Sequence, residues 1–232
     1  MSSKKLGRGV ALVGAGMSKF GAFPEKSSRD LFVEAFQSMR QSVDKDFDPT
    51  DIETIYIGNF SSDLFESQSH TAPIMADVVG LASRPATRIE DACASSGVAV
   101  REGIIGIASG LYDVVLVGGT EKMTNLPTER VTDTLAAASD ALYEASCGFT
   151  FPGLYAAIAT AYMDKYGATE EHFMKVGIKN HKNGALNPKA QFNKSIKDLM
   201  ESRIEKRRLS SSPSSLNPAS TLVPCWRLVS QS

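Results

Sequence analysis

The chain has 232 residues, 42% of them hydrophobic, and a formal net charge of −1. This composition is typical of a globular protein of one or two domains, and the pI of about 6.3 argues against nucleic acid as the main partner. No apolar run approaches the roughly 20 residues of a membrane-spanning helix, and three widely spaced cysteines favour a reducing compartment, so we expect a cytoplasmic protein.

The first half of the chain alternates between strand and helix patterns. Short apolar runs closed by glycine or turn residues predict strands, and apolar residues at three- and four-residue spacing predict helices. In chain order we expect a strand at 9–16, a helix at 27–43, a strand at 51–60, a helix within 67–83 that ends at Gly80, a strand at 86–92, a helix at 95–111 and a strand at 113–119. The alternation favours an α/β fold: a mainly parallel sheet with helices on both faces.

The second half of the chain has a different pattern. Helical spacing at 132–146, 154–167 and 169–183 predicts a helical insertion or cap. From about Ser210 the sequence is rich in serine and proline and has no sustained period, which predicts a disordered tail. We therefore predict an α/β domain, a helical domain and an atypical tail, at 1–120, 121–205 and 206–232.

One cysteine lies where a catalytic residue could be activated. Cys93 falls between the predicted strand at 86–92 and the predicted helix at 95–111, among alanines, serines and a glycine. The first N–H groups of a helix lack partners and lie at the positive end of its dipole, so they stabilise a thiolate and can hold an oxyanion. Strand–nucleophile–helix elbows of this kind occur in covalent enzymes. Free cysteines are also often inert packing, and the spacing alone leaves both interpretations open.

The residues around Cys93 resemble those of the thiolase family. Cys93 begins a C-A-S-S stretch, a helix rich in small residues follows, and the next strand ends in G-G-x-E-x-M, with Gly119 and Glu121. The stretches 10–31 and 149–192 are similar to the archaeal and sterol-carrier-type branch, so the resemblance covers about residues 8–195. Glu90 departs from the pattern, since many members have a smaller polar residue there. The resemblance implies a thiolase-like layered fold with a helical loop domain and identifies Cys93 as the catalytic nucleophile.

The resemblance implies acyl transfer between thioesters of coenzyme A. Cys93 would attack an acyl-CoA and hold the acyl group, and a second acyl-CoA would then attack that thioester to give a 3-oxoacyl-CoA. Acetyl transfer that yields acetoacetyl-CoA for isoprenoid synthesis is the expectation for this branch, and thiolysis is the reverse reaction. We expect no cofactor beyond the CoA thioesters and no metal, because no His and Cys cluster has ligand spacing.

Two catalytic groups of the family have no counterpart in the sequence. Thiolases use a histidine in H-P-x-G and a second cysteine in C-x-G, and neither motif occurs here. His181 matches a family position in the helical insertion, where we expect packing or a contact close to CoA. We expect His70 to lie in a loop and His172 to be exposed to solvent. Cys147 is expected to pack within the insertion, and Cys225 lacks the glycine of the second cysteine motif.

The resemblance therefore covers the N-terminal half of a thiolase and its loop domain. It stops near Lys206, and we expect a premature stop or a shifted reading frame and no complete condensation by this chain alone. The main alternative is a non-catalytic thiolase paralogue that binds acyl-CoA or dimerises. The family also implies a homo-oligomer formed through the N-terminal domain, and it is compatible with a partnership with hydroxymethylglutaryl-CoA synthase and a small bridging protein.

Overall fold

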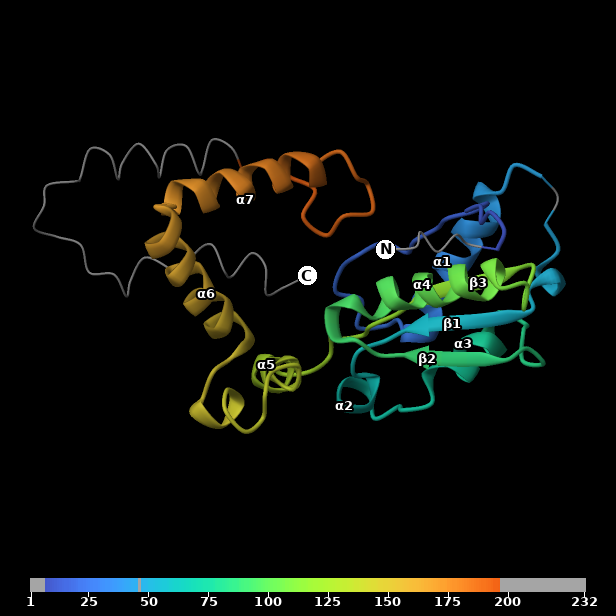
Figure 1. Cartoon of the computed structure of the whole chain (residues 1–232), viewed down its shortest axis with the longest axis horizontal. Coiled ribbons are helices and arrows are strands. Elements are labelled where there is room, and N and C mark those ends of the chain that lie inside the picture. Colours follow the sequence, from blue (N-terminus) through green and yellow to red (C-terminus); the bar gives the residue numbers. More distant parts are fainter. Residues whose placement is uncertain (1–6, 46, 197–232) are drawn as a thin grey trace, which may run out of the picture. The chain divides into compact units, whose positions relative to one another are not determined.

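The computed structural model describes residues 7–45 and 47–196, which belong to two compact units (Figure 1). The first unit holds the segment that ends at Ser18 together with Ala22–Thr134, and the second holds Lys19–Gly21 and the chain from Leu135. Cys93 therefore belongs to the first unit. The predicted tail at 206–232 lies outside the described residues.

A three-stranded parallel sheet forms the centre of the first unit. The strands are β1 (Thr54–Gly58), β2 (Ala86–Ile89) and β3 (Val115–Gly119), in the order β2-β1-β3. Gly58 pairs with Ile89 on one side and with Gly119 on the other, so the carboxyl ends of the three strands lie together. The prediction of an α/β fold with a parallel sheet is confirmed.

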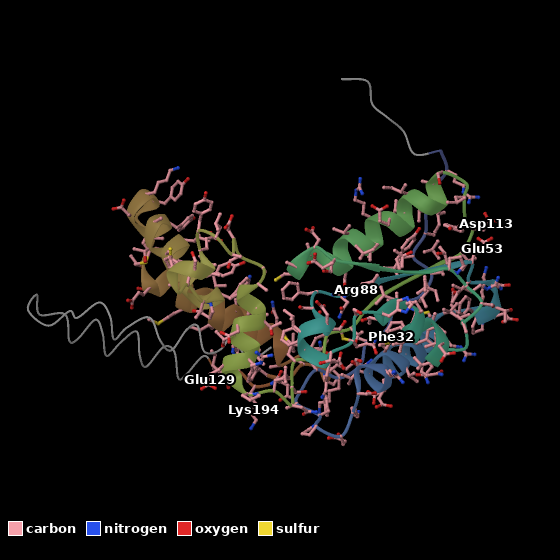
Figure 2. The ribbon with its side chains drawn as sticks, turned by 90° about the horizontal axis from the view of Figure 1, so that it is seen from below. Phe32, Glu53, Arg88, Asp113, Glu129 and Lys194 are labelled. Carbon is pink, nitrogen blue, oxygen red and sulfur yellow. The ribbon has the colours of Figure 1, made fainter. Side chains whose placement is uncertain are left out.

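The opposite end of the sheet is fixed by one carboxylate. Glu53, just before β1, accepts hydrogen bonds from the backbone N–H groups of Asp113 and Val114, just before β3, and Figure 2 shows Glu53 and Asp113 close together. Because both strands are tied where they begin, their register also fixes where they end.

Helices cover both faces of the sheet, as predicted. α1 (Ser28–Ser42) and α3 (Thr71–Val78) lie on one face, and α4 (Ser95–Ala108) packs on β1 and β3 from the other (Figure 1). Side chains alternate between the faces of a strand, so Leu116 points to α1 and α3 while Val117 points to α4. The core on the α1 side is built from large apolar side chains, among them Phe32, Phe36, Ile55, Ile57, Met75 and Leu116.

Local capping explains where the helices begin and end. The N–H of Asp30 donates to the Ser27 hydroxyl and the N–H of Ser27 donates to the Asp30 carboxylate, which closes a capping box at the start of α1. α3 ends just before Gly80, whose φ of 81° suits glycine. Three short helices complete the first unit, and the sequence pattern did not predict them: η1 (Pro49–Asp51), α2 (Ser62–Glu66) and η2 (Ala92–Ala94).

The prediction of a strand at 9–16 is wrong. This segment has no regular secondary structure and forms no ladder with any described strand, and Leu12 is 88% exposed. It is held near its ends, where Arg8 donates a hydrogen bond to the last turn of α4 and the N–H of Ala15 donates to Ser42 at 2.9 Å. An apolar run closed by glycines specifies extended backbone, but a strand also needs a partner that lies far away in the sequence.

The remaining helices are α5 (Thr128–Ala136), η3 (Ala145–Cys147), α6 (Phe151–Tyr166) and α7 (Glu170–Gly184). In place of the predicted helix at 132–146, α5 begins earlier and is shorter. It does not continue to 146 because the Asp140 carboxylate accepts the N–H groups of Leu142 and Tyr143 and forms a turn. α6 is capped by Gly167, which follows its last residue in the left-handed conformation with φ of 66°. In the described part of the chain, no helix is long and apolar enough to cross a membrane.

Candidate active site

Cys93 lies in η2, the single turn that joins β2 to α4, and its side chain is exposed. The turn follows the carboxyl end of β2 directly. In open parallel sheets this is the edge at which ligands bind, because the connecting loops gather there. The structure therefore places the Cys93 thiol at the accessible, loop-rich edge of the sheet, whereas an inert cysteine would be buried in the core.

The backbone just before Cys93 is strained. Ala92 has a φ of 45°, in the left-handed region that non-glycine residues rarely occupy. Hydrogen bonds on both sides hold it there: the N–H of Ala92 donates to the Glu90 carboxylate at 2.6 Å, and the N–H of Ala94 donates to the carbonyl of Asp91 at 2.8 Å. Strain of this kind persists only where the surroundings over-determine the conformation, and it is enriched at functional sites.

The buried hydroxyl of Ser95 closes the turn. Its Oγ accepts the N–H of Asp91 at 2.9 Å and donates to the carbonyl of Ala92 at 2.7 Å, so one side chain connects the strained residue and the residue before it to the start of α4. Ser95 is only 4% exposed, whereas its neighbour Ser96 is exposed at the start of α4. The two serines that follow Cys93 thus differ: the Ser95 hydroxyl holds the turn by hydrogen bonds, and Ser96 is exposed at the start of α4.

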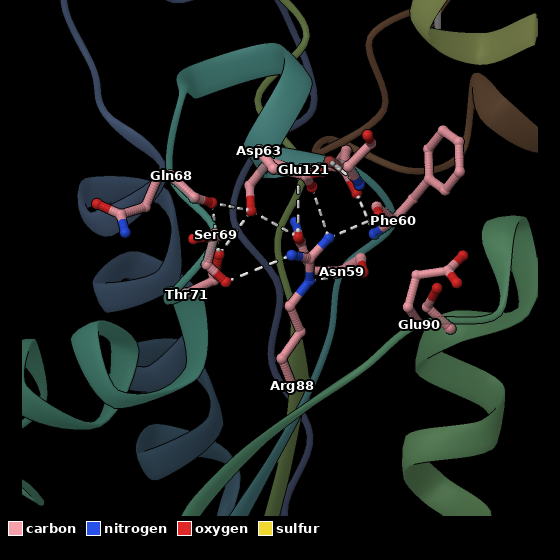
Figure 3. A network of polar contacts seen from close by, with 12 residues as sticks. Asn59, Phe60, Asp63, Gln68, Ser69, Thr71, Arg88, Glu90 and Glu121 are labelled. Atoms are coloured by element: carbon pink, nitrogen blue, oxygen red, sulfur yellow. Dashed lines mark hydrogen bonds and ion pairs between the residues drawn. The ribbon is translucent and has the colours of Figure 1, made fainter. Parts of the chain in front are cut away.

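A polar network holds the loop after β1 (Figure 3). β1 and β2 are parallel and end side by side, so this loop lies at the same edge of the sheet as the turn that holds Cys93. From β2, Arg88 pairs with the Asp63 carboxylate at 2.9 Å and donates to the carbonyl of Phe60 at 2.7 Å. From the end of β3, Glu121 accepts the N–H groups of Phe60 and Ser61 at 2.7 and 3.2 Å. The loop is therefore held by side chains from both flanking strands.

Burial dominates the electrostatics of Glu121. It raises the pKa of the Glu121 carboxyl above the ordinary value, although the N–H groups of Phe60 and Ser61 and the charge of Arg88 act in the opposite direction. The sequence pattern marks Glu121 only as part of the G-G-x-E-x-M motif, and it does not mark Arg88 as a residue of the site. A charged residue in a short strand gives no sequence signal that separates a clamp from a solvated side chain.

The three histidines differ in their surroundings. His70 is exposed at the start of α3, and exposed His172 accepts the N–H of Thr169 at 2.9 Å as a cap of α7. In the second unit, the half-buried His181 has its Nδ1 3.3 Å from the carbonyl oxygen of Lys194, and its ring centroid is 6.0 Å from that of Phe192. These contacts fit the packing role considered for His181, and a contact with CoA stays a prediction.

The expectation for Cys147 is wrong. We expected it to pack within the insertion, but its side chain is exposed. The helix predicted through 132–146 ends at Ala136, and Cys147 falls instead in η3, followed by Gly148 with φ of 80°. A residue in such a surface turn has no opposing helix face to pack against. Cys225 lies outside the described residues.

Comparison with known proteins identifies the family. The family model described as thiolase, N-terminal domain, matches residues 10–222. The chain belongs to the thiolase family. Membership confirms the resemblance that the residues around Cys93 suggested, and the layered α/β architecture agrees with it.

Two archaeal thiolases are similar over most of the chain. An acetyl-CoA acetyltransferase of Methanothermobacter thermautotrophicus is 42% identical over 80% of this chain and 47% of its own length, and that of Methanocaldococcus jannaschii is 43% identical over 80% and 46%. The benzoylsuccinyl-CoA thiolase subunit BbsB of Thauera aromatica is 30% identical over 86% and 50%. The chain thus spans about half the length of the curated relatives it matches.

Proposed function

We propose that this chain carries the nucleophile-bearing half of a thiolase-type acyltransferase and that Cys93 accepts the acyl group. One observation carries the proposal: Cys93 is exposed on a strained, hydrogen-bonded turn at the start of α4, at the carboxyl edge of a parallel sheet. The names of the two archaeal relatives support acetyl-CoA as the acyl donor.

The proposed step is a thioester exchange. The Cys93 thiolate attacks the carbonyl carbon of acetyl-CoA, and the N–H groups in the first turn of α4 stabilise the negative charge on the carbonyl oxygen. The bond between the carbonyl carbon and the CoA sulfur then breaks. CoA leaves with the proton that the Cys93 thiol has given up, and the acetyl group stays on Cys93 as a thioester.

Condensation with a second acyl-CoA needs a base for the α-proton, and losing such a group commonly costs about 10²–10⁴-fold in rate. Because the sequence contains neither H-P-x-G nor C-x-G, we propose that the isolated chain stops at the acyl-enzyme. We further propose that the protein is cytoplasmic and forms a homo-oligomer. The complete reaction would supply acetoacetyl-CoA for isoprenoid synthesis, in a complex with hydroxymethylglutaryl-CoA synthase.

Selective alkylation tests the role of Cys93. Limiting iodoacetamide followed by peptide mapping should label Cys93 first, and acetyl-CoA should slow that labelling. Cys147 is an internal control, because it is also exposed but lies outside the elbow. Preferential labelling of Cys147 or Cys225, or labelling of Cys93 that acetyl-CoA leaves unchanged, counts against the proposal.

A second candidate is a non-catalytic paralogue that binds acyl-CoA or dimerises. One observation favours it: the sequence contains neither H-P-x-G nor C-x-G, the two further catalytic motifs of the family. This protein would be protected by acetyl-CoA at Cys93 but would never become acetylated. Replacing His181 by alanine and measuring CoA binding by calorimetry shows whether this residue contributes to the affinity.

A further inference from the structure

We propose that Gly58 and Gly119, the last residues of β1 and β3, are positioning residues for Cys93. They set how closely the first turn of α4 approaches the strand ends, and the contact is made through Ser96. This inference rests on the proposed role of Cys93 as the nucleophile and names the residues that hold the thiol in place.

The approach at Gly58 involves the backbone of the helix. A Cβ atom at Gly58 would lie 2.5 Å from the amide nitrogen of Ser96 and 2.6 Å from both its Cα and its hydroxyl oxygen. Nonbonded carbon atoms need about 3.5 Å, so any side chain at Gly58 forces the start of α4 outward by about 1 Å. The backbone of a helix cannot rotate away as a side chain can, and the whole first turn has to move.

The approach at Gly119 involves a side chain. A Cβ atom there would overlap the hydroxyl oxygen of Ser96, while the Ser96 Cβ would be 3.5 Å away, which is an ordinary contact. Neither Gly58 nor Gly119 has a positive φ. Alanine therefore fits the backbone conformation at both positions, and the cost of each substitution comes mainly from the collision with Ser96. At Gly119 a tight contact of 3.0 Å with the carbonyl oxygen of Gly58 adds to it.

A displacement of Ser96 reaches Cys93 through the turn. Ser96 directly follows Ser95, whose hydroxyl bonds residues 91 and 92 on the far side of Cys93. The turn and the first residues of α4 are thus joined by hydrogen bonds and move together. A misplacement of about 1 Å at a reacting group can cost about 10²-fold in rate.

Gly103 provides a matched control on the same helix. A Cβ atom at Gly103 would lie 2.8 Å from Cγ2 of Val117, so Gly103→Ala also crowds α4 against β3. The collision lies two turns further along the helix and involves a side chain of the strand interior. This variant reports what general crowding between α4 and the sheet does to the protein.

The experiment measures the rate of iodoacetamide alkylation of Cys93 relative to that of Cys147 in the same molecule, together with thermal unfolding. We expect Gly58→Ala and Gly119→Ala to lower this ratio about tenfold. Gly103→Ala should keep the ratio within about twofold of the wild type even if it unfolds earlier. Ser96→Ala should restore most of the ratio in the Gly119→Ala background but not in the Gly58→Ala background. Removing the hydroxyl relieves the closest contact at Gly119, whereas the Cβ at Gly58 still collides with the backbone nitrogen and the Cα of residue 96.

Folded Gly58→Ala and Gly119→Ala proteins with the wild-type ratio would overturn the inference, and so would rescue of both variants by Ser96→Ala. If Gly58→Ala does not fold, the pair Gly119→Ala and Gly119→Ala/Ser96→Ala decides. The labelling selectivity of the wild-type protein shows which of the two proposals a negative result refutes. A wild type without preferential labelling of Cys93 refutes the nucleophile, whereas a selective wild type with insensitive glycine variants refutes only the positioning role.

Discussion

Replacing Ala92 by glycine should make the protein more stable and Cys93 less reactive. Ala92 has a φ of 45°, where an L-residue with a Cβ atom is crowded by its own carbonyl group. Glycine has no such penalty. The substitution therefore removes strain from the turn that carries Cys93 without removing any side-chain hydrogen bond.

The magnitude follows from two opposing costs. The left-handed conformation costs an alanine about 1–2 kcal/mol, and glycine loses about 0.5–1 kcal/mol more conformational freedom on folding. The difference between these two costs is a net gain of about 0–1.5 kcal/mol in the free energy of unfolding, with a midpoint of about 0.75 kcal/mol. Because glycine also leaves the turn freer to sample other conformations, the alkylation rate of Cys93 should fall relative to that of Cys147.

Urea unfolding of the wild type, Ala92→Gly and Ala35→Gly measures the effect. Ala35 lies inside α1, where glycine should cost about 1 kcal/mol, so the two alanine-to-glycine changes are expected to have opposite signs. Should Ala92→Gly lose as much stability as Ala35→Gly, the strain inferred at Ala92 is absent and our reasoning about the turn is refuted.

Four further substitutions test other parts of the first unit by urea unfolding. Arg88→Met leaves the carbonyl oxygens of Asn59 and Phe60 without this donor and should lower the free energy of unfolding by about 2–3 kcal/mol. An unchanged urea midpoint would show that Arg88 does not hold the loop after β1. Burial raises the pKa of Glu121, so its stabilising contribution is present at low pH and is lost as pH rises from 4.5 through the raised pKa. The stability of the wild type relative to Glu121→Gln should therefore fall as the pH rises above 4.5, and a rise would show the opposite shift. Gly16→Ala places a Cβ 2.5 Å from the carbonyl oxygen of Ala35 and should cost about 1–3 kcal/mol, whereas Gly9→Ala meets no atom within 4 Å and should stay within about 0.5 kcal/mol. Equal costs would show that residues 9–16 do not rest on α1.

Local signals explain what the sequence predicts well. The capping box of Ser27 and Asp30 and the apolar spacing up to Met39 define α1, and Gly80 marks the end of α3. The elbow at Cys93 follows from the order of a strand, small residues and a helix. Each of these features depends on residues within a few positions of one another, so the pattern contains the necessary information.

Features that depend on distant residues could not be predicted in this way. The segment 9–16 has the pattern of a strand but lies beside α1 and α4 without a ladder partner, and pairing is decided by residues far away in the sequence. The approach of Ser96 to Gly58 and Gly119 joins three segments separated by more than twenty residues each. Glycine at a strand end suggests only a close neighbour, and the sequence does not say which one.

The most direct test of the nucleophile is the acetyl group itself. Purified protein, free of host thiolase, is incubated with acetyl-CoA, and the peptides that contain Cys93, Cys147 and Cys225 are analysed by mass spectrometry beside the Cys93→Ala variant. We predict a small fraction of acetylated Cys93, labile to hydroxylamine as a thioester is, none at that site in Cys93→Ala, and no acetoacetyl-CoA above background. Acetylation of Cys147 or Cys225 with Cys93 untouched would contradict the assignment of Cys93. Acetoacetyl-CoA that forms with the wild type and disappears with Cys93→Ala would show instead that the chain contains a complete site.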